Sequence, residues 1–375
     1  MYLRRLSLTN FRVYERLQLE LQSGLTVFVG ANAGGKTSLL EAMHVLGTTK
    51  SPRTNADCEL VRWGTDVARV EGVFVSRTER ETRLAVGIEA ACARGASGKR
   101  LEVEGEVVGT AGDMIGRASV VMFAPDDLAI IKGGPSLRRR FLNTAIAQLR
   151  PTYLDNLARY RRALAQRNEL LKNLNRGGHG FAEVEPWTGQ LVQAGAGLAM
   201  ERRHFIADLD RWASNLHRQI GNQETLSLKY HGELAEAADE ASAEVHFRDR
   251  LEELADLETR RGTTLAGPHR DELQVEVDGA SVRQFGSQGQ QRTAALSLKL
   301  GQARVSQEWS EEPPLLLLDD CLSELDPERA TAVLGLASTL DGLVVTSAKL
   351  DPALRDRPEA HFYTVGGGMV RRGVG

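Results

Sequence analysis

A lysine, hydroxyl side chains and several glycines near the N-terminus have the types and spacing needed to hold a phosphate chain. In GANAGGKTS, the residues Gly30, Gly35, Lys36 and Thr37 occupy the fixed positions of a phosphate-binding loop. Backbone N–H groups would surround a β-phosphate, the lysine would bridge the β- and γ-phosphates, and the threonine hydroxyl would coordinate Mg²⁺. We therefore expect ATP and Mg²⁺ as cofactors. The residues expected to contact the nucleotide are Gly30, Ala31, Asn32, Ala33, Gly34, Gly35, Lys36, Thr37 and Ser38.

Two adjacent carboxylates, Asp319 and Asp320, supply the second part of this chemistry. They follow four leucines at 315–318, an apolar run typical of a buried parallel strand. Acids at the end of such a strand lie at the sheet edge where open α/β sheets bind ligands. Asp319 would hold Mg²⁺, and Asp320 would orient or deprotonate water against the γ-phosphate. We predict ATP hydrolysis with Lys36 and Asp320 as catalytic residues. The alternative interpretation is that Asp320 is only a solvent-exposed acid in a turn.

A third motif, FGSQGQQR at 285–292, begins a predicted helix. Ser287 is a good N-cap, and helix N-termini favour anions. Ser287, Gly289 and Gln290 make a polar helix start that contains glycine and is a second potential anion site. Capped helix starts that contain glycine are common, so this motif indicates an anion site only in combination with the other two.

These motifs need a sheet to position them, and the sequence predicts one that is interrupted by helices. Alternating Leu17, Leu19 and Leu21 indicate a strand, and the first 110 residues are rich in strand patterns. After Pro135 the pattern is helical, with one helix running from Pro186 to just before Gly221 and another over 246–260. Strand patterns resume after residue 262. We predict an α/β head formed by 1–135 and 262–375, with 136–261 inserted as a short antiparallel helical arm.

Composition is ordinary for a water-soluble protein, with 42% hydrophobic and 26% charged residues and a net charge of −3. No apolar run approaches the roughly 18 residues of a membrane helix, and no signal-peptide core is present, so we expect a cytoplasmic protein. Three scattered cysteines, Cys58, Cys92 and Cys321, indicate neither a disulfide framework nor a zinc site. The small net charge hides an uneven distribution of charged residues along the chain, because residues 132–172 alone carry +8.

The order of the motifs resembles the ATP-binding-cassette heads of the SMC-type DNA-repair ATPases, and most closely their bacterial recombinational-repair members. The resemblance covers nearly the full length. Its segments are LTNFRVY (8–14), GANAGGKTSLLEA (30–42), PDDLAIIKGGPSLRRRFLN (125–143), AGPHRDEL (266–273), FGSQGQQR (285–292) and LLLLDDCLSELD (315–326).

This resemblance implies roles that the residues alone do not show. Arg12 would approach the nucleotide phosphates, and Ser287 to Gln290 would act as a signature motif on the γ-phosphate of a second subunit. Asp326 would lie in the dimer-facing loop. ATP would hold a head-to-head homodimer, and weak, DNA-stimulated hydrolysis would release it. The expected partners are gapped or junction DNA in the nucleoid, together with RecO and RecR during recombinase loading.

Several positions depart from the general cassette pattern. Gln288 replaces a glycine of the transporters, and Asp320 replaces a longer glutamate, which favours slow turnover. VVTSAKL contains no switch histidine, so Thr346 or Ser347 would take that role or leave it vacant. MFAPDDLAII offers no glutamine for the usual Mg²⁺ contact. Ala33 stands where this loop commonly has a glycine.

The basic stretch 132–172 is a candidate DNA-binding face, although such runs are often only solvated helix faces. The arginines expected to contact DNA are Arg138, Arg139, Arg140, Arg159, Arg161 and Arg162. Aromatic residues are only 5% of the chain, which favours contact with the duplex backbone over base stacking. Three other functions remain open: a transporter-type nucleotide-binding subunit, a small-molecule kinase, and a nucleotide-binding clamp without hydrolysis.

Overall fold

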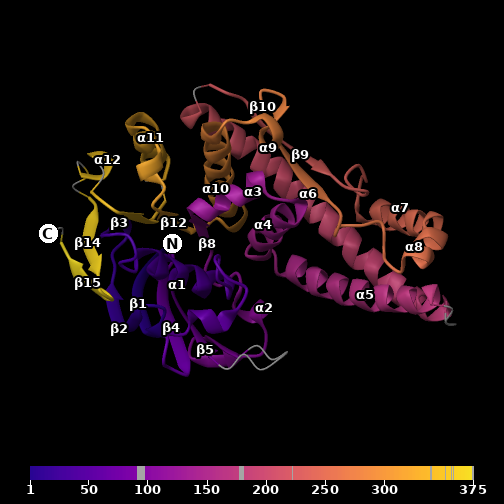
Figure 1. Cartoon of the computed structure of the whole chain (residues 1–375), viewed down its shortest axis with the longest axis horizontal. Coiled ribbons are helices and arrows are strands. Elements are labelled where there is room, and N and C mark those ends of the chain that lie inside the picture. The colour runs from indigo at the N-terminus through magenta and orange to yellow at the C-terminus, as the bar shows by residue number, and fades with distance from the viewer. Residues whose placement is uncertain are drawn as a thin grey trace.

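A head built on two sheets and a protruding helical arm make up the molecule (Figure 1). The computed structural model describes residues 1–90, 98–176, 181–221, 223–337, 340–350, 352–355, 357 and 359–373. The indigo N-terminal segment and the yellow C-terminal segment lie side by side in the head. Cys58 is partly exposed and Cys321 is buried, whereas Cys92 lies outside the described residues.

A six-stranded sheet in the head carries the motifs. Its order is β15-β14-β3-β13-β12-β8, and all neighbouring strands are parallel except β14 and β15. The strands are β3 (Gly24–Val29), β8 (Val120–Phe123), β12 (Leu315–Asp319), β13 (Gly342–Ser347), β14 (His361–Gly366) and β15 (Met369–Arg372). Because β3 and β12 are both parallel to β13, the residues that follow them meet at one edge of the sheet.

A second sheet of six antiparallel strands covers one side of the first. Its order is β2-β1-β4-β5-β6-β7. The strands are β1 (Tyr2–Phe11), β2 (Tyr14–Glu20), β4 (Val67–Val75), β5 (Glu81–Glu89), β6 (Lys99–Val103) and β7 (Glu106–Val108). The helix α1 (Lys36–Thr48) packs between the two sheets, and its Leu39 and Met43 share a buried cluster with Leu6 of β1 and Leu317 of β12. The phosphate-loop helix is therefore held from both sides.

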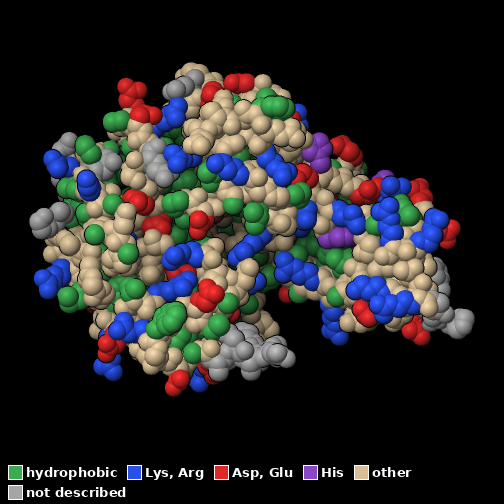
Figure 2. Space-filling model, viewed as in Figure 1, with side chains coloured by type: hydrophobic (Ala, Val, Ile, Leu, Met, Phe, Trp, Pro, Cys, Tyr) green, Lys and Arg blue, Asp and Glu red, His purple; other side chains and the backbone are tan. Residues whose placement is uncertain are grey.

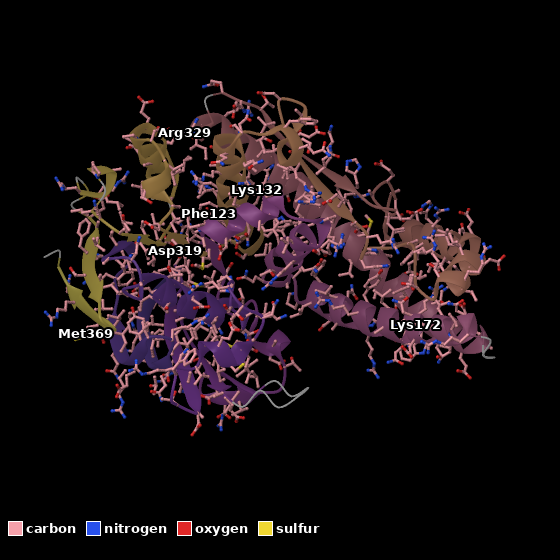
Figure 3. The ribbon with its side chains drawn as sticks, in the orientation of Figure 1. Phe123, Lys132, Lys172, Asp319, Arg329 and Met369 are labelled. Carbon is pink, nitrogen blue, oxygen red and sulfur yellow. The ribbon has the colours of Figure 1, made fainter. Side chains whose placement is uncertain are left out.

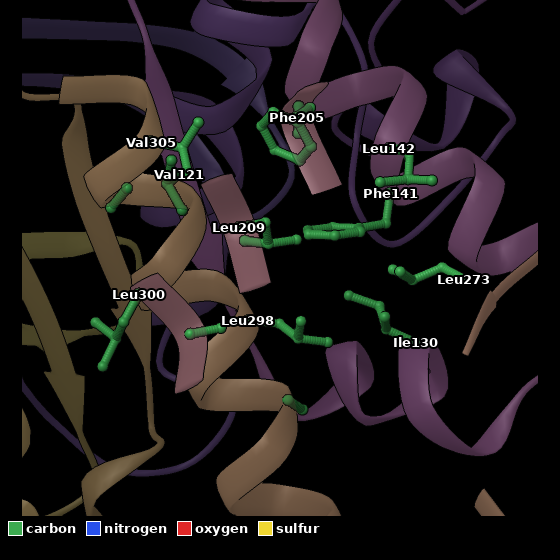
Figure 4. Packing of buried hydrophobic residues seen from close by; sticks show 14 of the residues in the cluster. Val121, Ile130, Phe141, Leu142, Phe205, Leu209, Leu273, Leu298, Leu300 and Val305 are labelled. Atoms are coloured by element: carbon green, nitrogen blue, oxygen red, sulfur yellow. The ribbon is translucent and has the colours of Figure 1, made fainter. Parts of the chain in front are cut away.

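Helices cover the other side of the parallel sheet. Leu316 and Leu318 of β12 belong to the cluster formed with α4 (Pro135–Ala147), α6 (Glu185–Ile220) and α10 (Gln288–Ser310). Figure 4 shows Phe141 of α4 and Leu209 of α6 beside each other, with Val305 of α10 close to Val121 of β8. The alternate leucines of β12 thus face two different clusters, because successive side chains of a strand point to opposite faces.

The arm consists mainly of α5 (Pro151–Asn175) and α6, which pack against each other. As the sequence predicts, α6 starts beside Pro186 and ends before Gly221. Leu191, Leu198 and Phe205, which follow one another at intervals of seven residues, are buried. The helix predicted over 246–260 is instead two helices, α7 (Glu240–Glu253) and α8 (Ala255–Arg261). The chain turns at residue 254, which serves as the C-cap of α7 and the N-cap of α8.

A three-stranded sheet, β11-β10-β9, lies against the arm. Its strands are β9 (Leu226–His231), β10 (Glu272–Val277) and β11 (Ala280–Ser281). Strand β9 comes from the predicted insertion and β10 from the predicted head, so hydrogen bonds cross the predicted boundary at 261/262. The division into a head and an inserted arm stays a prediction.

Short elements complete the described chain. They are η1 (Asp57–Leu60), α2 (Ala111–Met114), η2 (Pro125–Asp127), α3 (Leu128–Lys132), η3 (Phe181–Glu183), α9 (Val282–Phe285), η4 (Leu322–Glu324), α11 (Pro327–Ala337) and α12 (Pro352–Arg355). Within the described ranges, no helix has the length and apolar character of a membrane span.

Candidate nucleotide-binding site

The phosphate loop and the paired acids line one pocket of about 420 Å³. Thr37 and Asp319 are 282 residues apart in sequence, yet the threonine hydroxyl donates to Asp319 Oδ1 at 3.2 Å. The lining residues are Val13, Asn32, Ala33, Gly35, Lys36, Thr37, Ser38, Arg53, Asp319 and Asp320. A hydroxyl and a carboxylate are oxygen ligands of the kind that Mg²⁺ prefers, so the residues present fit this cation.

The glycines of the loop are required by close neighbours. A Cβ on Gly30 would lie 2.0 Å from the carbonyl oxygen of Val365 in β14. Gly35 has φ of +108°, and a Cβ there would lie 2.6 Å from the hydroxyl of Tyr14. That hydroxyl donates to the carbonyl oxygen of Gly35 at 3.0 Å, and burial raises the pKa of Tyr14. Tyr14, the tyrosine of the LTNFRVY segment, therefore packs against the phosphate loop and stabilises it.

Lys36 lies folded over the loop in this structure. Its Nζ donates to the carbonyl oxygens of Gly30 at 2.7 Å and Ala31 at 3.0 Å. Ala33, at the tip, adopts the left-handed region with φ of 63°, which suits glycine better. The amine is thus poised above the cradle, where β- and γ-phosphate oxygens would take the place of the two carbonyls.

Thr346 connects the two acids. Its hydroxyl donates to Asp319 Oδ1 at 2.6 Å and accepts from the backbone N–H of Asp320 at 3.0 Å. Burial raises the pKa of Asp319, and the hydrogen bonds from Thr346 and Thr37 oppose that rise. A bound cation would favour the charged carboxylate further. Of the two residues considered in place of a switch histidine, Thr346 is at the site, whereas the Ser347 hydroxyl donates to the carbonyl of Lys349.

Asp320 is held in an unusual backbone conformation. Its φ of 45° lies in the left-handed region, which asparagine and aspartate tolerate better than most residues. The Ser323 hydroxyl lies 3.0 Å from the carbonyl oxygen of Asp320 and 3.3 Å from its Oδ1. Residues in such sparsely populated backbone conformations cluster at functional sites, and Asp320 lines the pocket.

Arg12 does not line the phosphate pocket in this structure. Its Nε and Nη2 donate to the two carboxylate oxygens of Glu41 at 2.8 and 2.7 Å, and Nη1 donates to the carbonyl of Glu59. The buried Glu41 lies on α1 and also accepts from the Ser51 hydroxyl at 2.6 Å. Arg53, 3.7 Å from Glu41, lines the pocket instead. Sequence reasoning missed Arg53, because it belongs to no motif.

The signature residues lie elsewhere on the surface. The Ser287 hydroxyl accepts from the backbone N–H of Gln290, whose side chain accepts from the Ser287 N–H and donates to Glu224. Ser287, Gln288 and Gly289 are exposed, and no residue of 285–292 lines the phosphate pocket. The capped helix start therefore exists as predicted, but it does not complete the pocket of its own chain.

Asp326 caps the start of α11. Its Oδ1 accepts from the backbone N–H of Arg329 at 3.0 Å, and its Oδ2 lies 3.3 Å from Arg329 Nε. Figure 3 shows Arg329 on α11, apart from Asp319 on β12. Asp326 is exposed, so it is available to a partner molecule.

The predicted DNA-binding arginines separate into two groups. Arg138 is buried and donates to both carboxylate oxygens of Glu272 at 2.6 and 2.7 Å, as well as to the carbonyl of Gly133. The expectation that Arg138 contacts DNA does not hold in this structure, because its donors are occupied inside the fold. Arg139 is half-buried and donates to the carbonyl of Asp271 at 2.7 Å. The remaining arginines, which are exposed, are Arg140, Arg159, Arg161 and Arg162.

A buried polar cluster holds the base of the arm, and we call it the arm-root network. It comprises Asn143, Tyr153, Arg202, Pro268 and Asp271. Arg202 donates to Asp271 Oδ2 at 2.7 Å, to the Pro268 carbonyl at 2.6 Å and to Asn143 Oδ1 at 2.9 Å. Its Nε donates to the Tyr153 hydroxyl at 3.1 Å. Together with the pair formed by Arg138, the network joins the segments 125–143 and 266–273, which gives these two motifs a structural role.

The phosphate loop, the paired acids at a neighbouring strand end and the capped signature helix define an ATP-binding-cassette head of the SMC type. The model of the RecF/RecN/SMC N-terminal domain family matches residues 2–348. An SMC head bound to the winged-helix domain of ScpA has a TM-score of 0.55 at 15% identity and shares the fold.

Proteins of higher sequence identity identify the family within this class. DNA replication and repair protein RecF of Exiguobacterium sp. is 39% identical over 94% of this chain and 93% of its own. That of Geobacillus thermodenitrificans is 37% identical over 99% of both chains. A solved structure of the recombination mediator protein RecF with ATP has a TM-score of 0.90 at 30% identity and covers 100% of this chain and 98% of its own. The chain therefore belongs to the RecF family.

Proposed function

We propose that this protein is an ATP-dependent, DNA-binding recombinational repair protein whose heads dimerise face to face around ATP. One observation carries the proposal: the signature helix is capped and exposed, yet it contributes nothing to the phosphate pocket of its own chain. A signature motif that lies outside the phosphate pocket of its own chain would be free to contact the nucleotide of a second copy. The relatives are DNA replication and repair proteins, which favours this function over a transporter subunit or a kinase.

Each residue of the pocket has a role in this proposal. Backbone N–H groups of the loop and Lys36 bind the phosphates, while Thr37 and Asp319 hold Mg²⁺, which supplies charge neutralisation at the transferred phosphoryl group. Thr346 keeps Asp319 and the backbone of Asp320 in register. Asp320 orients water as a general base. Its short side chain favours slow hydrolysis, which would reset the dimer.

Exposed groups around the signature support a dimer face. Phe285, two residues before Ser287, is 74% exposed, and large exposed aromatic side chains are enriched at protein interfaces. Asp326 is exposed as well. In a head-to-head dimer these residues would lie near the partner's nucleotide, and gapped or junction DNA would be bound by the joined heads and arms. RecO and RecR would then act with the dimer in recombinase loading.

A charge change at Ser287 tests the dimer. Aspartate and asparagine cap helices about as well as serine, so Ser287→Asp and Ser287→Asn both keep α10 intact. We expect Ser287→Asp to abolish the ATP-dependent dimer at concentrations where the wild type is fully dimeric, because a carboxylate facing a γ-phosphate costs several kcal/mol. Size-exclusion chromatography with light scattering, run in ADP, in ATP and in ATP with gapped duplex, measures this.

The asparagine variant is the matched control and should still dimerise in ATP. Lys36→Arg should stay monomeric throughout, because it disturbs phosphate binding. A wild-type protein that remains monomeric in ATP with gapped DNA would contradict the proposal, and dimers in every condition would remove the ATP switch.

The exposed arginines of α5 test the DNA face. Lys and Arg side chains are visible along the lower edge of the arm in Figure 2, where α5 runs. We expect Arg159→Ala, Arg161→Ala and Arg162→Ala together to weaken duplex binding. They should also reduce the slope of log affinity against log salt by about 0.9 for each DNA phosphate that the arginines no longer neutralise. Fluorescence anisotropy across a salt series measures both quantities.

The matched control replaces three exposed arginines with alanine at the end of the head that lies farthest from the arm (Figure 1). These are Arg355, Arg371 and Arg372, and their loss should leave the salt slope unchanged. ATP binding should be intact in both variants. Equal affinities and slopes for the two variants would show that α5 is not the DNA face.

A further inference from the structure

A second cavity, of about 330 Å³, lies at the junction of the head and the arm. It shares no lining residue with the phosphate pocket. Side chains from the C-terminal half of α1, from α3 and α4, from α5 and from α10 line it. Its volume lies at the lower end of the range of about 300–1,000 Å³ found for small-molecule sites. Two of its lining residues, Arg140 and Arg161, are also candidates for DNA contact, but no role proposed above uses the cavity itself.

One wall of this junction cavity is apolar. Val120 and Met122 of β8, Phe141 of α4 and Leu157 of α5 are buried and line it. Phe141 presents an aromatic ring, and Figure 4 shows this ring reaching from α4 toward α6. A flat apolar group of a ligand would fit this wall, since ligand sites are mostly lined by hydrophobic and aromatic side chains.

The lining of the cavity carries excess positive charge. Its cations are Lys50, Arg140, Arg161 and Lys299, against the two carboxylates of Asp126 and Asp127. Lys299 is buried, lies 5.6 Å from the centre of the Phe141 ring and is 3.7 Å from Asp127 Oδ1.

Two titratable groups report the same crowding of cations. Burial, together with repulsion from Arg161 and Arg140, lowers the pKa of Lys50. Burial and the nearby Lys299 lower the pKa of His44 to about 4, so this histidine is neutral at pH 7. An anionic group would relieve the repulsion among the cations.

A residue that lines the cavity also has a buried acceptor without a partner. Gln302 is 5% exposed and lines the cavity, and its Oε1 has no hydrogen-bond partner among the described residues. An unsatisfied buried acceptor destabilises the fold, so a ligand that donates to it gains affinity. Gln302 follows Lys299 by three residues on α10, and residues at this spacing share a helix face. Gln302 and Lys299 could therefore contact the same ligand.

We propose that the junction cavity binds an amphipathic organic anion. Its aromatic body lies against Phe141 and the apolar wall, its anionic group is held by Lys299 and the other lining cations, and an N–H or O–H donates to Gln302 Oε1 after the Gln302 side chain turns toward the ligand. The bound molecule contacts α1, which begins at Lys36, and α10, which is capped by Ser287. It would thus lie between the two helices that start at the phosphate loop and at the signature.

Anilinonaphthalene sulfonate is a suitable probe, because it combines an aromatic body, a sulfonate and one N–H donor. We expect saturable, one-to-one fluorescence enhancement with the full chain in the absence of nucleotide. Lys299→Met should weaken the affinity about tenfold or more, and Gln302→Leu about two- to tenfold. Gln302→Leu should also raise Tm without ligand, which verifies that this variant is folded. Lys132→Met is the control. Lys132 is an exposed residue of α3 that lies outside the cavity and is labelled in Figure 3, so this variant should bind the probe with the affinity of the wild type.

Three outcomes would overturn the proposal. They are equal affinities for wild type, Lys299→Met and Gln302→Leu, displacement of the probe by a nonhydrolysable ATP analogue, and binding without saturation. The measurement needs no nucleotide, so its failure would leave the proposed ATP-dependent dimer untouched.

Discussion

Replacing Asp320 with asparagine is expected to lower ATP turnover by about 100-fold or more while leaving ATP binding intact. The carboxylate is the group proposed to orient water, and an amide cannot accept its proton. Asparagine also tolerates the left-handed φ of 45° at this position, so the backbone of the pocket should persist. Phosphate release at saturating ATP, with and without gapped duplex, measures turnover.

The same variant should prolong the ATP-bound dimer, because the step that resets it is blocked. Ser323→Ala is the matched control: it removes the hydroxyl 3.3 Å from Asp320 Oδ1 but keeps the carboxylate, so we expect a smaller loss of turnover. Asp320→Glu tests the opposite change. If the distance between the carboxylate and the attacking water limits turnover, the longer side chain should raise turnover. Identical phosphate release in Asp320→Asn and wild type would instead indicate a nucleotide clamp without hydrolysis.

Removing Arg202 is expected to cost about 3–5 kcal/mol of the free energy of unfolding, because it leaves Asp271 buried without its partner. Arg202→Met keeps the volume and apolar stem of the side chain, so the loss reports the charge and its hydrogen bonds. The Tyr230 hydroxyl, which also donates to Asp271, cannot replace a full positive charge. Urea denaturation monitored by circular dichroism measures the change, provided that unfolding is two-state.

Arg211→Met is the matched control on the same helix. Arg211 is exposed and pairs with Glu308 and Asp208 at the surface, where such pairs contribute about 0–1 kcal/mol. Adding Asp271→Asn to Arg202→Met should recover part of the stability, because it removes the unpaired charge. Equal costs for Arg202→Met and Arg211→Met would show that the arm-root network does not hold the arm.

Features with a local cause could be predicted from the sequence. The helix α6 begins beside a proline and ends before a glycine, and its apolar residues repeat at helical spacing. The cap at Ser287 follows from its own side chain and from Gln290, three residues later. The meeting of the phosphate loop and the acids is also predictable, because each follows a strand of parallel type, and such strands end at one edge of a sheet.

Features that depend on distant partners could not be predicted. Nothing in a run of arginines distinguishes Arg138, whose partner Glu272 lies 134 residues away, from the exposed Arg162. The separation of α7 from α8 depends on packing, since no proline or glycine interrupts 240–261. Likewise, the pairing of β9 with β10 joins two segments between which the sequence pattern indicates a domain boundary.

The topology of the parallel sheet also fixes when the phosphate loop can mature during protein synthesis. Strand β3, which leads into the loop, pairs on one side with β13 and on the other with β14. Both neighbours come from residues 342–366, and the Val365 carbonyl presses against Gly30. Chains grow from the N-terminus at about 5–20 residues per second. A ribosome-bound chain that already displays the whole loop sequence must therefore wait for more than 300 further residues before that loop gains its permanent walls, and an interrupted translation product would lack them.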